Sequence, residues 1–544
     1  MVSGELRGSP ASPGAAGAVM ARMRPAPVLP ESWPAPADPD GEKSAAKAAL
    51  EEVAADLERR GESVTGEAAE ILSTQVMMVR DPTLAQGIDD AVDGGRPAAW
   101  AVEQAFSGHL AALRAAGGYL AERATDLADL RDRAIAGLLG EQPPGIPDPG
   151  EPFVLIAVDL APADTVTLDP AKVRAIVTEK GGQTSHTAIL ARSLGIPAVV
   201  GCAGALEVAD GTVVIVDGDA GTVVLDPGQD LLDAVEGKAR ERRERLARYS
   251  GPGSTSDGHP VALLLNVGGG PAEAGDSEGV GLFRTEFLFL DREQAPSVAE
   301  QRTAYGEVFA AFPGRPVVIR TLDAGADKPV PFANADDEPN PALGVRGQRI
   351  ARRHPELLAA QLEAIALAAG DHDAEVKVMA PMIATPAEAA DFAARVRAHG
   401  LAAGVMIEVP AAAIRAEAIL AEVDFVSIGT NDLAQYTFAA DRMLGELGDL
   451  LDSWQPALLD LVASVAEAGR RAGKPVGICG EAAADPGLAP VFAGLGVTSL
   501  SMSAPAVPEV RAALRERTFD ECTAVAKAVR AAADATEARR AATS

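Results

Sequence analysis

Eight short apolar segments in the second half of the chain constrain its fold more than any other feature. Helical stretches separate most of them, so strand and helix patterns alternate along this region. Near-continuous apolar strands that alternate with helices are typical of a parallel sheet covered on both faces, and eight such strands predict a (β/α)8 barrel. The expected strands are residues 261–267, 279–286, 316–323, 376–382, 404–409, 425–430, 475–480 and 499–503.

The first half of the chain predicts two further kinds of structure. Small residues in 1–20 suggest a short strand segment, and the proline-rich stretch 24–40 suggests an extended connector. From residue 42 to about 140, apolar residues recur every three or four positions, which predicts a helical bundle. Residues 153–226 alternate β-like runs at 154–158, 173–177, 198–200 and 213–216 with one helix. We therefore expect a compact α/β unit with an inserted helical bundle.

A charged amphipathic stretch at 229–250 separates these halves and predicts a linker helix. The whole chain is thus expected to be a multidomain α/β protein. The predicted boundaries are 1–39 with 143–227 for the α/β domain, 40–142 for the helical subdomain, 228–252 for the linker helix, and 253–544 for the barrel with a C-terminal helix.

Composition excludes several classes of protein. At 544 residues the chain is too long for one core. Its formal net charge of -30 argues against non-specific nucleic-acid binding. It has no run of about 18 apolar residues, its first residues lack the apolar core of a signal peptide, and its 3 cysteines have no paired spacing. We expect a cytoplasmic protein without membrane insertion, disulfide framework or zinc motif.

One histidine lies at a predicted strand-to-helix junction. The strand ends at Val177, glycines follow, and a helix begins near Thr184, which places His186 in its first turn. Unpaired N–H groups and the helix dipole favour an anion there, so His186 could be a nucleophile whose phosphorylated form is stabilised. The alternative is that Thr184 and Ser185 only cap a helix with a polar first turn.

Polar residues gather where the expected barrel strands end, which is where active sites of such barrels form. Arginines suit phosphate and carboxylate groups, a Glu/Asp pair suits Mg²⁺, and a cysteine could protonate a carbanion or enolate. Each residue alone has a simpler explanation as a surface ion pair, a solvated carboxylate or a small core residue. Their position at the same end of successive strands favours a site. The residues are Arg284, Arg320, Lys328, Arg346, Glu408, Asn431, Asp432, Arg442 and Cys479.

Five motifs together resemble the enzyme I family of the bacterial phosphotransferase system, the phosphoenolpyruvate–protein phosphotransferases. They are the segments 181–192, 281–289, 407–410 and 429–436, followed by Asp441-Arg442. The resemblance covers nearly the whole chain.

Two alternative interpretations remain. Pyruvate phosphate dikinase and phosphoenolpyruvate synthase share the histidine segment and the barrel, but they need a large nucleotide-binding domain ahead of the histidine. A non-catalytic regulator of the same fold would have lost a nucleophile, metal ligand or arginine.

The resemblance implies a role for each of these residues. His186 would take the phosphoryl group of phosphoenolpyruvate on the ring nitrogen remote from the backbone, and Thr165 would hold the other ring nitrogen. Glu408 and Asp432 would bind Mg²⁺, and Cys479 would protonate enolpyruvate. The remaining residues would bind the substrate: Arg284 and Arg320 its phosphate, Arg442 and Asn431 the rest of it, with Arg346 and Lys328 as further members of the site.

The resemblance also implies partners and motion. The helical subdomain 40–142 would dock the phosphocarrier protein HPr, and the barrel domain would form a homodimer. Because nucleophile and substrate site lie on different domains, we expect a hinge rotation about residues 145–152 and the 229–250 helix. The chain departs from the family at Gln183, where many relatives carry arginine, and we expect this residue to affect acceptor docking or phosphohistidine stability. The tail after Thr523 matches less clearly.

Overall fold

The computed structural model divides the chain into two compact units, Met1–Glu236 and Gly237–Ser544. The expected multidomain α/β fold with a closed barrel is confirmed. None of the described helices is long and apolar enough to cross a membrane. The structure describes residues 4–33, 35–61, 75–116, 118–147, 149–160, 168–182, 185–268, 274–290, 292, 294–324, 330, 332–333, 338, 340–442, 444 and 447–543.

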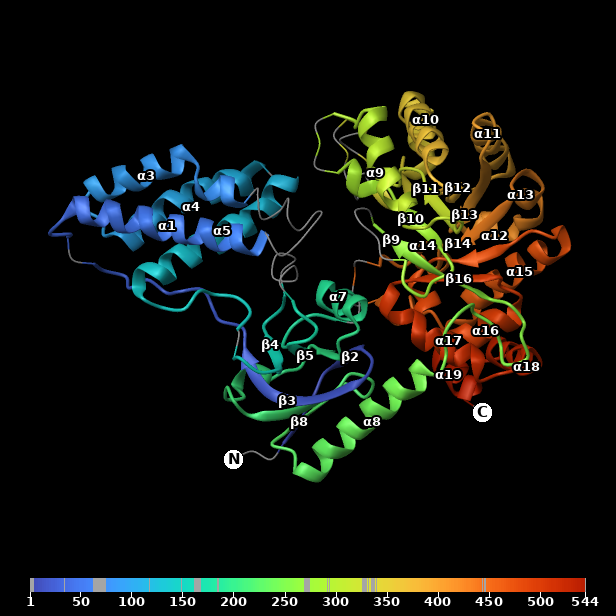
Figure 1. The fold of residues 1–544 in the computed structure, drawn as a ribbon, viewed down its shortest axis with the longest axis horizontal. Helices are drawn as coiled ribbons and strands as arrows, with labels where there is room; N and C mark the ends of the chain where they lie inside the picture. Colours follow the sequence, from blue (N-terminus) through green and yellow to red (C-terminus); the bar gives the residue numbers. More distant parts are fainter. Residues whose placement is uncertain are drawn as a thin grey trace. The chain divides into compact units, whose positions relative to one another are not determined.

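The first unit is built on an eight-stranded mixed sheet with the order β1-β8-β7-β3-β4-β5-β6-β2. Figure 1 labels several of these strands, among them β3, β4 and β5. Strands β3 to β6 are parallel, and antiparallel strands flank them. All five residues of β4 are buried, as expected for a central strand covered on both faces. The strands are β1 Glu5–Arg7, β2 Ser9–Ser12, β3 Ala15–Arg22, β4 Phe153–Ala157, β5 Val173–Thr178, β6 Ala198–Val200, β7 Val213–Asp217 and β8 Thr222–Leu225.

The four strands expected between residues 153 and 226 are confirmed, and β8 is an addition to them. The single segment expected in residues 1–20 is instead three strands, β1 to β3. Gly14, with a φ of 107°, lies between β2 and β3 and lets the chain turn there. Strands β1 to β3 therefore complete the sheet by pairing with β4, β6, β7 and β8, which lie more than a hundred positions later in the chain.

The helical bundle is inserted between β3 and β4. It contains α1 Pro39–Gly61, α3 Pro82–Asp93, α4 Ala98–Ala116 and α5 Gly118–Leu139, packed around a shared apolar core that includes Phe106 and Leu130. The break expected at residues 94–97 is confirmed, because α3 ends at Asp93 and Gly95 has a φ of 91°. The connector before α1 is tied to the bundle: Pro30 O accepts a 3.1 Å hydrogen bond from Trp100 Nε1.

The second unit is a closed barrel of eight parallel strands. All eight expected strands occur, but several end earlier than the apolar pattern suggested; β11, for example, ends at Arg320. The residues beyond these ends belong to the loops that carry the polar side chains. The strands are β9 Ala262–Val267, β10 Val280–Arg284, β11 Pro316–Arg320, β12 Glu375–Ala380, β13 Ala402–Ile407, β14 Phe425–Ile428, β15 Val476–Ile478 and β16 Ser499–Met502.

Helices surround this barrel and bury its outer face in one continuous apolar core. Capping boxes at Ser297, Thr385 and Thr518 fix the starts of three of them, because each side chain accepts a hydrogen bond from the backbone of a glutamate three residues later. The helices are α9 Val298–Ala310, α10 Pro355–Asp371, α11 Pro386–Arg397, α12 Pro410–Ile414, α13 Ala416–Glu422, α14 Thr430–Phe438, α15 Pro456–Ala472, α16 Leu488–Leu495, α17 Val507–Arg515, α18 Phe519–Arg530 and α19 Ala535–Thr543.

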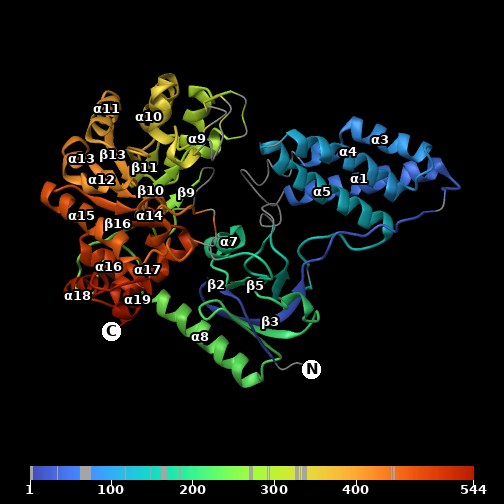
Figure 2. The same cartoon turned by 180° about the vertical axis from the view of Figure 1, so that it is seen from behind.

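The expected charged helix is α8, Gln229–Ala247. The turns of α8 that belong to the second unit lie beside the barrel helices (Figure 2). Ion pairs attach them to α17. Arg242 and Arg245 both contact Glu509, which is mostly buried, and Arg245 also contacts Glu516 at 3.2 Å. These contacts explain why a helix so rich in charge is stable against the barrel.

Candidate active site

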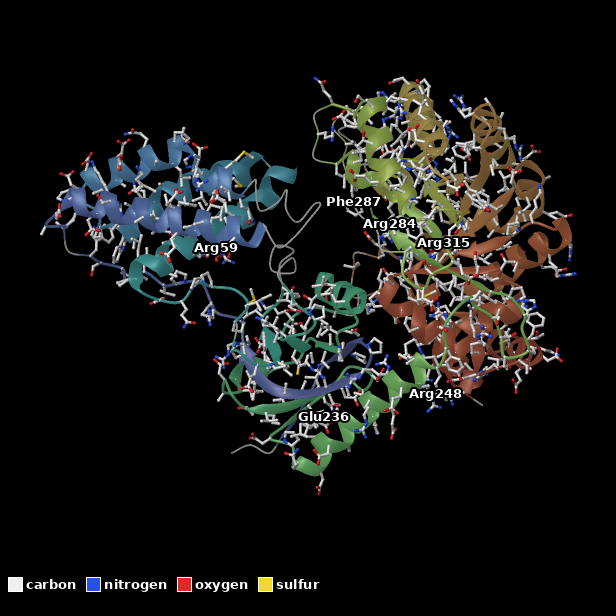
Figure 3. The ribbon with its side chains drawn as sticks, in the orientation of Figure 1. Arg59, Glu236, Arg248, Arg284, Phe287 and Arg315 are labelled. Atoms are coloured by element: carbon white, nitrogen blue, oxygen red, sulfur yellow. The ribbon has the colours of Figure 1, made fainter. Side chains whose placement is uncertain are left out.

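Two arginines occupy neighbouring strand ends at the mouth of the barrel. Arg284 is the last residue of β10, Arg320 is the last residue of β11, and the two are direct partners in the parallel register. Arg284 is exposed, as is Phe287 in the loop that follows (Figure 3). Arg320 is buried. One guanidinium group is therefore accessible from solvent, and the other is part of the interior of the site.

Two buried carboxylates hold Arg320. Its Nη2 forms an ion pair with Glu286, and its Nη1 lies 2.9 Å from Asp323 Oδ2. Sequence reasoning did not assign Glu286 or Asp323 to the site, although they are the last residues of the strands expected at 279–286 and 316–323 and lie just beyond β10 and β11. The signal was present, because a carboxylate next to an arginine at a buried strand end needs a partner of opposite charge.

The ion pairs continue from Asp323 across the barrel mouth. Arg346 Nη2 lies 3.6 Å from Asp323 Oδ1, and its Nη1 lies 3.9 Å from Asp432 Oδ1. Asp432 Oδ2 lies 3.6 Å from Arg442 Nη1. Arginine and carboxylate thus alternate in one row, Glu286, Arg320, Asp323, Arg346, Asp432 and Arg442, which we call the charge row. Such a row places several positive charges close together without leaving them uncompensated.

Glu408, directly after β13, is buried beside this row. Its Oε1 accepts a hydrogen bond from the Met382 backbone N–H. Met382 has a left-handed backbone conformation, with a φ of 58°, which is uncommon for a residue other than glycine. Burial, together with the nearby charges of Asp432 and Asp323, raises the pKa of the Glu408 carboxyl well above its ordinary value. Such a carboxyl is well placed to exchange its proton for a cation.

Glu408 and Asp432 fit the requirements of a divalent cation. Glu408 Oε2 and Asp432 Oδ1 are buried and accept no hydrogen bond from any of the described residues. Two carboxylates completed by substrate oxygens and water are a common set of ligands for Mg²⁺. Within the described ranges, no group of three or more His, Cys, Asp or Glu side chains could hold a metal by itself.

The Cys479 thiol is buried directly after β15. Its Sγ lies 3.7 Å from the Ile428 carbonyl oxygen, and it belongs to an apolar cluster with Leu282 and Met406. Burial raises the pKa of this thiol to about 11. Cys479 therefore keeps its proton at neutral pH, as an acid must.

Asn431 and Arg442 are held by contacts around α14. Asn431 lies in the first turn of α14, and its Oδ1 accepts a 3.1 Å hydrogen bond from the Glu481 backbone N–H. The Arg442 backbone N–H donates to Gln435 Oε1 at 3.1 Å. The first contact ties the start of α14 to the segment after β15, and the second ties Arg442 back to α14. Together they fix the positions of two residues expected to bind substrate.

The histidine motif lies in the first unit, at the start of α7, His186–Leu194. The helix begins slightly later than Thr184, because Ser185 is its N-cap and its hydroxyl accepts from the Ala188 backbone N–H at 3.3 Å. The expected cap is thus confirmed: Ser185 caps the helix, and His186 is its first residue. Thr165, Gln183, Thr184 and Lys328 lie outside the described residues.

Beside His186, a hydrogen-bonded pair fixes the start of α7 to the end of β4. Thr187, the second residue of the helix, is buried, and its hydroxyl donates to Asp159 Oδ1 at 2.7 Å. The same carboxylate oxygen accepts from the Leu160 backbone N–H at 2.9 Å. The first turn of α7 therefore has a defined position at the carboxyl edge of the parallel strands.

Comparisons with known proteins agree with this arrangement. Three family models match the chain in succession: PEP-utilising enzyme, N-terminal, over residues 7–123; PEP-utilising enzyme, mobile domain, over 149–221; and PEP-utilising enzyme, PEP-binding domain, over 243–519. A phosphoenolpyruvate-protein phosphotransferase of Streptomyces coelicolor is 53% identical over 547 residues, covering 99% of this chain and 98% of that protein. The chain belongs to the phosphoenolpyruvate-protein phosphotransferase family.

More distant members of this family match over similar lengths. The phosphoenolpyruvate-protein phosphotransferase of Haloferax volcanii is 41% identical over 495 residues, covering 87% of this chain and 86% of that protein. That of Priestia megaterium is 37% identical over 541 residues, covering 94% of each. The family membership expected from the five motifs is thereby confirmed.

Proposed function

We propose that this protein transfers the phosphoryl group of phosphoenolpyruvate to His186 and then to a histidine of the phosphocarrier protein HPr, the first step of the sugar phosphotransferase system. One observation carries the proposal. The barrel mouth combines a row of arginines with two carboxylates, each with a buried oxygen that accepts no hydrogen bond from the described residues, and with a protonated thiol. Phosphoenolpyruvate offers a matching set of groups: a phosphate, a carboxylate and an enolate carbon that must be protonated.

In this proposal the arginines bind and orient the substrate. Arg284 and Arg320 bind the phosphate, while Arg442 and Asn431 bind the rest of the molecule. Guanidinium groups bind such oxyanions in bidentate fashion, which fixes orientation as well as supplying charge. Arg346 and Lys328 complete the site. Glu286 and Asp323 hold Arg320 in place before the substrate arrives, so the electrostatic environment is set in advance.

Glu408 and Asp432 would hold Mg²⁺. When bound, the cation offsets negative charge on the phosphoryl group and on the oxygen that leaves it. Glu408 would release its proton as it becomes a ligand, since its carboxyl has a raised pKa. Asp432 also contacts Arg346 and Arg442, so one carboxylate would connect the cation with the arginines that bind the substrate.

The transfer is a displacement at phosphorus. The lone pair of the remote ring nitrogen of His186 forms the N–P bond, and the bond between phosphorus and the enol oxygen breaks. Cys479 then gives its S–H proton to the methylene carbon of enolpyruvate, which becomes pyruvate, and the thiolate recovers a proton from solvent. Thr165 would set the orientation of the His186 ring, and the start of α7 favours both the neutral ring and the phosphorylated product.

The remaining expectations become part of the same proposal. The helical subdomain 40–142 docks HPr, Gln183 affects that docking or the stability of phosphohistidine, and the protein acts in the cytoplasm as a homodimer formed through the barrel. His186 would reach the phosphoenolpyruvate site by a hinge rotation. Small-angle scattering with and without phosphoenolpyruvate and Mg²⁺ tests that rotation, and a rigid particle that still turns over would contradict it.

The test of the proposed function is incubation of the full chain with ³²P-labelled phosphoenolpyruvate and Mg²⁺. Wild type is expected to take up phosphate that is labile in acid and stable in base, and His186→Ala is expected to take up none. His399→Ala, which removes an exposed histidine of the barrel unit, is the matched control and should label like wild type. Wild type that stays unlabelled, or His186→Ala that still labels, would refute the assignment.

A further inference from the structure

A chain of buried polar side chains lies behind the arginines of the active site. Its centre is Gln361 on α10, which is 1% exposed. Gln361 Oε1 accepts from the Leu322 backbone N–H at 2.9 Å. Its amide nitrogen donates to Thr285 Oγ1 at 3.1 Å and to the Tyr305 hydroxyl at 3.1 Å. The acceptor and both donors of this side chain are therefore used.

The neighbours of Gln361 are equally well satisfied. The Thr285 hydroxyl accepts from Gln361 and donates to the Arg320 carbonyl oxygen at 2.8 Å. The Tyr305 hydroxyl accepts from Gln361 and donates to Gln301 Oε1 at 3.0 Å. Thr285, Tyr305 and Gln301 are each no more than 2% exposed. Because each of these hydroxyl and amide groups has a defined donor or acceptor partner, the geometry of each member of the network depends on the others.

The position of the network gives it a role beyond core packing. β11 ends at Arg320, and the last inter-strand bond beyond it runs from the Thr321 N–H to Met379 O. The next N–H, that of Leu322, is paired by Gln361 instead. The side-chain amide thus continues the hydrogen bonding where the barrel ladder stops, because buried backbone groups need partners.

The two strand ends that Gln361 joins carry four charged residues of the site. Thr285 lies between Arg284 and Glu286, and Leu322 lies between Arg320 and Asp323. Gln361 therefore contacts Thr285, which adjoins Arg284 and Glu286, and Leu322, which adjoins Asp323 and lies two positions after Arg320. A change in its position would move both strand ends together, without any direct contact between Gln361 and a substrate.

We propose that Gln361, acting through Thr285, is a positioning residue that sets the spacing of Arg284 and Arg320 for the phosphoryl group of the substrate. The inference rests on the proposed function. Bidentate binding tolerates displacements of roughly 0.5 Å, and a misplacement of about 1 Å can cost on the order of 100-fold in rate. Two strand ends held by directed hydrogen bonds meet that requirement better than ends held by apolar contacts, which have no preferred direction.

The experiment compares the kinetics of phosphate uptake from phosphoenolpyruvate in five variants of the full chain. Gln361→Leu removes the centre of the network, and Thr285→Val removes the hydroxyl that links it to Arg320. Both are expected to lower kcat/KM by about 10- to 100-fold, mainly through a higher KM for phosphoenolpyruvate. Thr285→Ser keeps the hydroxyl and should stay within about 3-fold of wild type.

Two further variants separate positioning from stability. Tyr305→Phe breaks one bond of Gln361 but leaves both of its contacts to the strand ends, so its kcat/KM should stay within about 3-fold of wild type. Leu358→Ala, nearly one turn earlier on α10, removes buried apolar atoms and lowers the melting temperature but leaves the hydrogen bonds of Gln361 to Thr285 and Leu322 in place. Its kcat/KM is expected to be unchanged at a temperature where all variants are folded.

The outcomes distinguish this inference from the proposed function. Failure of wild type to take up phosphate would refute the proposed function itself. If wild type is active, the positioning role is overturned when Gln361→Leu and Thr285→Val have the same kcat/KM as wild type. It is also overturned when kcat/KM falls in proportion to the melting temperature in all variants, including Leu358→Ala. If Gln361→Leu does not fold, the pair Thr285→Val and Thr285→Ser decides the question, because equal activity in both would overturn the role.

Discussion

Replacing Glu286 with glutamine should destabilise the barrel by an amount that its burial determines. Glu286 and Arg320 form an ion pair whose side chains are 4% and 7% exposed. Two unit charges about 4 Å apart interact by about 4 kcal/mol at an effective dielectric constant of 20, and breaking buried pairs costs roughly 3–5 kcal/mol. Because Asp323 still compensates Arg320 at 2.9 Å, we expect the lower end, about 3 kcal/mol.

The measurement is equilibrium urea unfolding of the full chain, with hydrogen exchange of the β10 and β11 peptides to identify the transition of the barrel. The matched control is Asp371→Asn, which neutralises an equally well-formed but exposed pair: Asp371 lies 2.7 Å from Arg302, and their side chains are 43% and 48% exposed. Exposed pairs contribute little to stability, because water and salt screen their charges. A loss below about 1 kcal/mol for Glu286→Gln, or equal losses in both variants, would refute the reasoning that burial controls the energy.

Three other predictions follow from the described contacts. Cys479→Ala should slow pyruvate formation about 100- to 10,000-fold, because the substitution removes the proton donor. A lactate dehydrogenase-coupled assay measures this rate, and an unimpaired rate would exclude Cys479 as the acid. Ser185→Ala should destabilise the start of α7 by about 1 kcal/mol, because it removes the N-cap hydroxyl. The loss should appear as faster hydrogen exchange in that helix, and unchanged protection would mean that the cap contributes nothing. The free energy of unfolding should fall between pH 9 and 11, because burial raises the pKa of the Cys479 thiol from 9.0 to about 11. Between these pH values the folded state keeps a proton that the unfolded chain has lost, so the stabilisation is complete below pH 9 and is lost as the pH rises through 11. The loss amounts to at most about 3 kcal/mol. Cys479→Ala, which lacks the thiol, should lose less stability over the same pH range.

The barrel could be predicted from the sequence because its signal is local. Each of the eight strands is a short apolar run, and each run is buried on both faces wherever it lies in the barrel, so the pattern needs no knowledge of its neighbours. The same local logic located Arg284, Arg320, Glu408 and Cys479, since each follows or ends a strand and parallel strands of a barrel all end at one face.

The pairing of the site residues was not predictable in this way. Glu286 and Arg320 are 34 positions apart, and Gln361 lies 39 positions beyond the Leu322 N–H that it pairs. A glutamine in the middle of a helix has no pattern that distinguishes a buried hub from a solvated surface residue. Its role depends on which backbone groups the barrel leaves unpaired opposite it.

By itself, therefore, the sequence determined the fold class, the family, the histidine at the start of a helix and the face of the barrel on which the polar residues meet. The tertiary structure alone decided how these residues are held: the charge row from Glu286 to Arg442, the raised pKa of Glu408, and the hydrogen bonds from Gln361 to the ends of β10 and β11. The physical reason is that apolar patterning acts along the chain, whereas the strength of charges and directed hydrogen bonds depends on burial and on partners that folding brings together.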